Sequence, residues 1–192
     1  GQARVTFFNK SVFTLMPADR LGNNLQSAKK LGTLSSSSLR IRDAIGRTDR
    51  TDVGRFNISQ RSSFNLQLSG FQQGTTIGVD VFTVKNSSGK AWRKILRTDL
   101  SRLKPREWRS RFNLLSRSTV TQPNTPITLA LPPGEYYLKI SSRKGTTPYT
   151  LTTSAIAEAG VPTSPNQPAI PGLPVKLNRA WIKQLGTSAN DY

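Results

Sequence analysis

The chain of 192 residues contains no cysteine and no histidine. Without cysteine, disulfides, thiolate metal ligands and cysteine nucleophiles are excluded. Without histidine, the commonest general base and the commonest metal ligand are missing as well. No phosphate-binding loop or dinucleotide fingerprint takes their place. We therefore expect a protein that is not an enzyme and that needs no cofactor.

Acidic residues are also scarce. Ten Asp and Glu stand against 28 Lys and Arg, which gives a net charge of +18 at pH 7. A field of this sign attracts acidic partners and discourages self-association. Calcium needs about six or more oxygen ligands, several of them carboxylates. Asp49 and Asp52, in the stretch "RTDRTD", are weak candidates for such a site, and we expect them to stabilise a turn and no metal to be bound.

Long hydrophobic runs are missing, since none approaches the roughly 20 apolar residues that span a bilayer. Instead, short segments alternate apolar with polar residues, and turn-forming stretches such as "PPG" separate them. Several short strands of this kind, without long helices, predict an all-β fold, an antiparallel jelly-roll-like β-sandwich. The expected strands lie within residues 55–58, 64–68, 78–84, 127–131, 135–141 and 149–155.

The two ends of the chain differ from this pattern. Residues 1–20 are expected to form an N-terminal arm, and residues 21–157 the sandwich, with at most a short turn of helix within 23–38. Residues 158–175 are rich in proline and predict a semi-extended linker. In the tail, residues 176–192, Trp181 shares a helical face with its neighbours at i−4 and i+4, so we expect this tail to dock on a partner.

A basic insertion of residues 90–124 interrupts the expected strands. The stretch from Lys85 to Arg111 holds ten Lys or Arg and only two acids. Apolar residues recur at helical spacing from Trp92 to Leu103, which predicts an amphipathic helix that Pro105 ends. A second apolar stripe, which begins at Trp108, follows the break.

Four interpretations of the basic insertion remain open. It is a solvated loop whose aromatic residues cover the end of the sandwich, a nucleic-acid surface, a membrane-surface helix, or a docking element for acidic proteins. Trp and Arg are enriched at the energetic centres of protein interfaces, which favours the last interpretation. The expected partner contacts are Trp92, Arg93, Lys94, Arg97, Arg102, Arg106, Trp108, Arg109, Arg111 and Phe112, together with Trp181 in the tail.

Three stretches occur in an order that is typical of one family: "NNLQSAKKLGTL", "DRTDVGRFNISQRSSFNLQLSG" and "LALPPGEYYLKISSRKGTTPYTLTTSA". Together they resemble the pre-peptidase C-terminal domain, in the form abundant in cyanobacteria. The resemblance implies a jelly-roll-like sandwich without catalytic activity, used as an accessory or binding module. The chain departs from the family in its strong positive charge, in the basic insertion, and in lacking an acidic stretch before the third strand, which puts calcium binding in doubt.

These observations predict a non-catalytic linker or scaffold subunit that binds acidic proteins in a large assembly. The cyanobacterial resemblance points to the phycobilisome, with phycobiliproteins as partners, in the cytoplasm at the thylakoid. One alternative is a secreted or periplasmic accessory module that binds a cell-surface assembly or polysaccharide. Nucleic-acid binding is a third possibility, although no known nucleic-acid motif is present.

Overall fold

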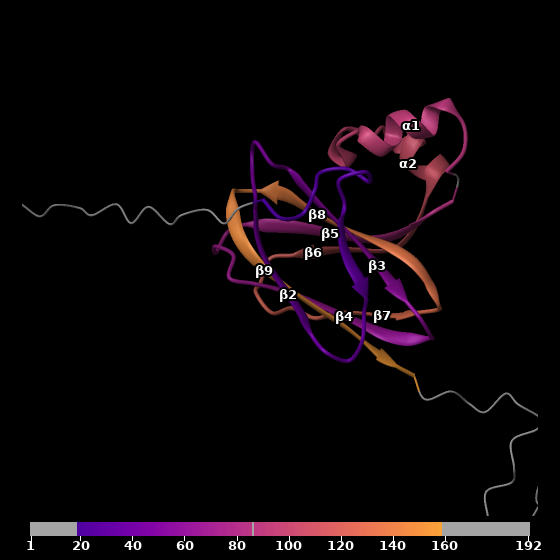
Figure 1. The fold of residues 1–192 in the computed structure, drawn as a ribbon. Helices are drawn as coiled ribbons and strands as arrows, with labels where there is room; N and C mark the ends of the chain where they lie inside the picture. Colours follow the sequence, from indigo (N-terminus) through magenta and orange to yellow (C-terminus); the bar gives the residue numbers. More distant parts are fainter. Residues whose placement is uncertain (1–18, 86, 159–192) are drawn as a thin grey trace, which may run out of the picture. The chain divides into compact units, whose positions relative to one another are not determined.

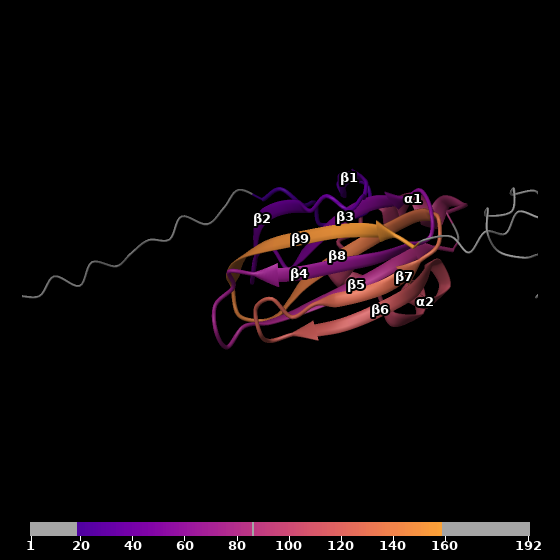
Figure 2. The same cartoon turned by 90° about the horizontal axis from the view of Figure 1, so that it is seen from below.

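The computed structural model describes residues 19–85 and 87–158, which form two β-sheets packed face to face (Figures 1 and 2). The five-stranded sheet has the order β1-β3-β8-β5-β6, and the four-stranded sheet has the order β2-β9-β4-β7. The strand pairs are antiparallel except for β1 with β3. The strands are β1 Lys29–Thr33, β2 Leu39–Ile45, β3 Thr51–Ile58, β4 Ser62–Ser69, β5 Thr76–Val84, β6 Phe112–Val120, β7 Ile127–Leu131, β8 Gly134–Lys144 and β9 Thr147–Ala157. The predicted all-β sandwich is confirmed.

The main hydrophobic core lies between the two sheets. It forms because every second residue of a strand points to the same face, so the alternating pattern supplies one apolar face per sheet. At its centre the ring of Phe56 stacks on those of Phe64 and Tyr136, with ring centroids 4.9 and 5.5 Å apart. Phe56 and Phe64 are almost completely buried, so this stack joins the two sheets.

A second hydrophobic cluster covers the outer face of the five-stranded sheet, the face turned away from the other sheet. On β5, Val81 belongs to the main core and the adjacent Phe82 to the second cluster, as alternation requires. The cover comes from the segment between β5 and β6, whose helices lie together at one end of the sandwich (Figure 1). They are α1 Lys90–Arg97, a short 3₁₀ helix Leu100–Arg102 and α2 Pro105–Arg111. Among the described residues, no helix is long and apolar enough to cross a membrane.

Pro105 begins a helix instead of ending one. The sequence predicted one helix from Trp92 to Leu103, but α1 ends at Arg97 and Pro105 occupies the first turn of α2. This position suits proline because the first helical N–H has no acceptor in the helix and the fixed φ of proline is already helical.

Two other local expectations were wrong, and one strand was missed. The inserted segment ends at Arg111, because residues 112–120 form strand β6 of the five-stranded sheet. Residues 29–33, where at most a turn of helix was expected, form β1, and β2 at residues 39–45 was not anticipated. In these segments, pairing with neighbouring strands determined the secondary structure, because the local sequence preferences are weak. We call residues 90–111 the helical insertion from here on.

Candidate functional site

A strap formed by residues 19–26 joins the two sheets and the helical insertion. Its backbone N–H groups at Arg20 and Leu21 donate to Oδ2 of Asp43 on β2, at 2.9 and 2.8 Å. The carbonyl oxygen of Gly22 accepts a hydrogen bond from Val53 N on β3 at 2.6 Å. A β-carbon on Gly22 would overlap the backbone oxygen of Ser27. Only glycine therefore allows this close approach.

The other end of the strap contacts the helical insertion. Gln26 N donates to Leu96 O at 2.9 Å, and Leu100 N donates to Asn23 O at 3.2 Å. Leu25 is buried in the second hydrophobic cluster beside the insertion. The position of the insertion and the position of the strap are therefore coupled.

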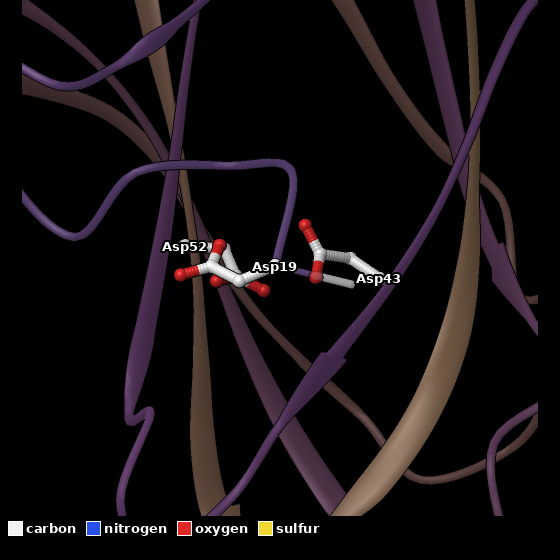
Figure 3. Close-up of side chains that lie close together, drawn as sticks. All are labelled: Asp19, Asp43 and Asp52. Carbon is white, nitrogen blue, oxygen red and sulfur yellow. The ribbon is translucent and has the colours of Figure 1, made fainter. Parts of the chain in front are cut away.

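Three carboxyl groups meet where the strap crosses β2 and β3. Oxygen atoms of Asp19, Asp43 and Asp52 lie within 4.8 Å of one another, and Figure 3 shows the three carboxyl groups gathered in one place. Asp43 and Asp52 are 0 % exposed, whereas Asp19 is exposed. We call these three residues the acid cluster; it is buried on one side and open to solvent at Asp19.

The members of the acid cluster differ in their hydrogen bonds. Both oxygens of Asp43 accept backbone N–H groups, since Oδ1 accepts from Ala44 N at 2.8 Å in addition to the strap bonds at Oδ2. Oδ2 of Asp52 accepts from the Tyr149 hydroxyl at 2.5 Å. Oδ1 of Asp52 is buried and has no hydrogen-bond partner among the described residues, and the same holds for one side-chain oxygen each of Asn23 and Asp49. Buried oxygens of this kind normally have partners.

The surroundings of Asp52 strongly favour its protonated form. Burial raises the pKa of Asp52 to about 9; the hydrogen bond from Tyr149 opposes this rise, and the negative charges of nearby aspartates add to it. Burial also raises the pKa of Asp49 to about 6. A carboxylate that is buried loses the hydration that stabilises its charge, so it takes up a proton more readily. A bound cation would have the same neutralising effect on Asp52.

The acid cluster offers oxygen ligands of the kind that a hard divalent cation prefers. Calcium and magnesium prefer carboxylate and amide oxygens, and Asp52 Oδ1 is a buried oxygen without a partner among the described residues. Asp19 provides an exposed entry to the cluster. The sequence had singled out Asp49 and Asp52 but not Asp19 or Asp43, because the members come from three separate segments and share no recognisable spacing.

The helical insertion presents a second and opposite kind of surface. Its two acids are occupied locally: Asp99 Oδ1 accepts from Ser101 N at 2.8 Å, and Glu107 Oε2 accepts from Lys104 N at 3.0 Å. They stabilise the beginnings of helices and do not neutralise the neighbouring cations. Within the described residues, no ion pair involves the exposed Arg93, Lys94, Arg102, Arg106 or Arg109.

Two further predicted contact residues make hydrogen bonds to uncharged groups. Arg97 is exposed and donates from Nε to Gln26 Oε1 at 3.0 Å, which links α1 to the strap. Arg111 is half-buried and donates to the backbone oxygen of Ser88 at 3.3 Å. Trp181 and the Pro-rich linker from residue 159 onward lie outside the described residues.

The predicted aromatic contacts pack on the sheet. Phe112 is only 2 % exposed, so its ring is not available at the surface. Trp108 is partly buried, with its ring 5.0 Å from that of Phe82, and Trp92 also packs against the second hydrophobic cluster. This arrangement matches the interpretation in which the aromatic residues cover the sandwich. The cations of the insertion, and not its aromatic rings, therefore dominate what a partner would meet.

A groove of about 760 Å³ lies between α2 and the outer face of the five-stranded sheet. Apolar side chains, including Trp108 and Leu114, line part of it. Its charged lining is entirely basic: Lys85, Arg109, Arg117, Lys139 and Arg143. Of these five, the sequence had named only Arg109 as a contact residue. Arg117 lies on β6, Lys139 and Arg143 lie on β8, and Lys85 directly follows β5, so only the fold brings them beside α2.

Asp80, on β5, holds two of these cations in place. Arg117 Nε lies 2.9 Å from Asp80 Oδ1, and Lys139 Nζ lies 2.7 Å from Asp80 Oδ2. Burial acts to raise the pKa of Asp80, but the bonds from the two cations outweigh it and keep that pKa below its usual value. Lys139 Nζ also lies 4.6 Å from the centre of the Trp108 ring, a cation–π contact that connects α2 to the sheet.

No family model matches the chain, and no curated protein sequence matches it. Among solved structures, the pre-peptidase C-terminal domain of a collagenase from Bacillus anthracis is similar, with a TM-score of 0.42 and 16 % identity over 66 % of this chain and 92 % of that one. A mitogen from Yersinia pseudotuberculosis has a TM-score of 0.41 and 8 % identity over 70 % and 99 % of the two chains. A periplasmic inhibitor of g-type lysozyme from Aeromonas hydrophila has a TM-score of 0.36 and 12 % identity over 66 % and 97 %. The chain is thus similar in structure to a pre-peptidase C-terminal β-sandwich, at low sequence identity and in its fold alone.

Proposed function

We propose that this protein is a non-catalytic linker or scaffold subunit that docks onto acidic proteins through the helical insertion. The observation that carries the proposal is that, among the described residues, no ion pair involves the exposed Arg93, Lys94, Arg102, Arg106 or Arg109 of the insertion. Asp99 and Glu107 stabilise the beginnings of helices, so the exposed Arg and Lys side chains keep their charge for a partner. Arginine suits this role because its guanidinium group binds carboxylates through two parallel hydrogen bonds.

The finer form of the proposal names the assembly. The sequence motifs resemble the cyanobacterial form of the pre-peptidase C-terminal domain, and phycobiliproteins would offer such a chain large acidic surfaces. The proposed partner is therefore a phycobilisome in the cytoplasm, at the thylakoid. A secreted or periplasmic accessory module is the alternative, and it would use the same basic surface on a cell-surface assembly.

A pair of charge-reversal variants tests the docking surface. Arg93→Glu/Lys94→Glu changes the insertion, and Arg40→Glu/Arg42→Glu changes two exposed cations on β2 by the same total charge. Binding to purified phycobiliprotein assemblies at low salt is measured by co-sedimentation. We expect the insertion variant to bind at least about tenfold more weakly and the β2 variant to bind nearly as the wild type does.

The outcomes separate three explanations. Equal loss in both variants would mean that net charge alone, and not the insertion, attracts the partner. Binding that persists unchanged in about 0.5 M salt would contradict an electrostatic mechanism, because the Debye length is then only about 4–5 Å. Failure of the wild type to bind at low salt would reject the phycobilisome as the partner.

We propose as a second function that the acid cluster binds a divalent cation. The supporting observations are that Asp52 Oδ1 is buried and has no partner among the described residues, and that a carboxyl oxygen of Asp52 lies within 4.8 Å of oxygens of Asp19 and Asp43. Isothermal titration with Ca²⁺ tests it, with Asp52→Asn as the site variant and Asp99→Asn, at a half-buried aspartate that caps the 3₁₀ helix of the insertion, as the matched control. We expect binding in the wild type and in Asp99→Asn, and at least about tenfold weaker binding in Asp52→Asn.

The same titration contains an internal check. Because Asp52 is protonated near neutral pH, Ca²⁺ must displace that proton. The heat should therefore depend on the ionisation enthalpy of the buffer, by an amount that corresponds to about one released proton. Equal affinity of the wild type and Asp52→Asn would show that Ca²⁺ binds elsewhere or only nonspecifically.

A further inference from the structure

Strand β6 forms one edge of the five-stranded sheet, and the described residues place no strand on its other side. Figure 2 shows β6 at the margin of the sandwich with α2 beside it. Leu114 and Leu115 of this strand are 41 % and 44 % exposed. An edge strand offers a row of backbone N–H and C=O groups to which another strand can bind.

The charge around this edge determines which strand can bind. Arg117 lies on β6 itself, and Arg109 and Arg143 line the adjacent groove. These cations repel the same edge of a second copy of the chain, which is how proteins prevent edge-to-edge pairing. They attract a strand that carries carboxylates.

The groove continues the surface of the edge. Leu114 and Arg117 line the groove and pair with Phe82 and Asp80 of β5, which places their side chains on the outer face of the sheet. A strand added beside β6 would extend this face, so every second side chain of the added strand would point toward the same side as the groove. The groove offers that side both cations and apolar contacts such as Trp108.

We infer that the β6 edge and its groove bind an extended acidic segment of a partner protein by strand addition. The acidity of the partner rests on the function proposed above; the mode of binding does not. A polypeptide is favoured over a nucleic acid because the free edge presents peptide groups, which a phosphodiester backbone cannot pair in a ladder. Backbone bonds would supply affinity, and the cations would select carboxylates.

Backbone methylation of a probe peptide tests strand addition directly. The probe is a labelled peptide of alternating Glu and Val that matches the nine residues of β6. Two further versions carry N-methyl groups on every Glu or on every Val. In a strand, alternate N–H groups point to opposite sides, so only one of the two sets can bond to β6. We expect one methylated version to bind at least about tenfold more weakly, because several hydrogen bonds are lost, and the other to bind like the parent.

Protein variants locate the site. Arg109→Glu/Arg143→Glu should weaken peptide binding at least about tenfold, whereas Arg93→Glu/Lys94→Glu on α1 should leave it nearly unchanged. Loss of binding in both methylated peptides or in neither would overturn strand addition, even if the insertion still docks on acidic proteins. A single-stranded oligonucleotide of equal charge that displaces the peptide at lower concentration, or dimerisation of the chain that masks β6, would also overturn it.

Discussion

The acid cluster and the helical insertion handle charge in opposite ways. The cluster gathers carboxyl groups in a buried place, where Asp43 and Asp52 are 0 % exposed. The insertion displays cations such as Arg93 and Arg106 in solvent, without ion pairs among the described residues. Buried carboxyl groups act locally, because burial shifts their pKa values and they accept hydrogen bonds that order the neighbouring chain. Exposed cations instead create an electric field that acts on partner molecules. The exposed cations of the insertion should therefore tolerate substitutions that the cluster does not.

The largest effect is expected for Asp43→Ala. This change leaves three backbone N–H groups, those of Arg20, Leu21 and Ala44, without their acceptor. Each loss costs about 1 kcal/mol or more, so the free energy of unfolding should fall by about 3 kcal/mol or more. Urea unfolding measures it, and Asp43→Asn, which keeps an acceptor oxygen, should lose less. A fall below about 1 kcal/mol would show that the strap is not held by Asp43.

Trp108→Ala should destabilise the fold by about 2–3 kcal/mol, because the ring packs against Phe82 and Phe112. The sequence alone had suggested a docking residue whose loss weakens partner binding with little loss of folding. Leu115→Ala, at an exposed position, is the control and should change the free energy of unfolding by about 0.5 kcal/mol or less. If the variant keeps its stability but loses partner binding, Trp108 is a docking residue, as the sequence alone had suggested.

The raised pKa of Asp52 predicts that the free energy of unfolding depends on pH when no divalent cation is present. Its pKa is about 9 in the folded protein and near 3.8 in the unfolded chain. Between these values the folded state binds the extra proton, so stability falls as pH rises. From about pH 6 to about pH 7.5 the free energy of unfolding should fall by about 2 kcal/mol.

Asp52→Asn should remove most of this slope while keeping an acceptor for Tyr149. Chemical unfolding at a series of pH values in the presence of a chelator compares the two proteins. A wild-type stability that rises over this range would mean that Asp52 is ionised in the folded state.

The smallest effect on stability is expected in the insertion. Arg93→Glu/Lys94→Glu replaces two exposed cations that form no ion pair among the described residues, so the free energy of unfolding should change by about 0.5 kcal/mol or less. Thermal unfolding beside the partner-binding assay measures both properties of the same variant. A marked destabilisation would mean that these cations stabilise the fold, and the contrast with the acid cluster would then be wrong.

The sequence could predict the parts of the fold whose local pattern is strong. Alternation from Phe64 to Leu68 marks β4, and "PPG" marks the turn before β8, because side-chain direction in a strand has a period of two residues. Strand β6 could not be recognised, since at the edge of the sheet its exposed Leu114 and Leu115 stand side by side and break the alternation. Pro105 was misinterpreted because proline is compatible with both the end and the beginning of a helix.

The amino-acid sequence by itself determined the absence of thiol and imidazole chemistry, the excess of positive charge and the all-β class, since these depend on composition and short-range periodicity. Only the tertiary structure decided which charges meet. It brings Asp19, Asp43 and Asp52 together from three segments, and it places Arg117 and Lys139 on Asp80 beside α2. Such contacts follow from strand order and sheet packing, which join residues far apart in the chain and leave no mark on local spacing.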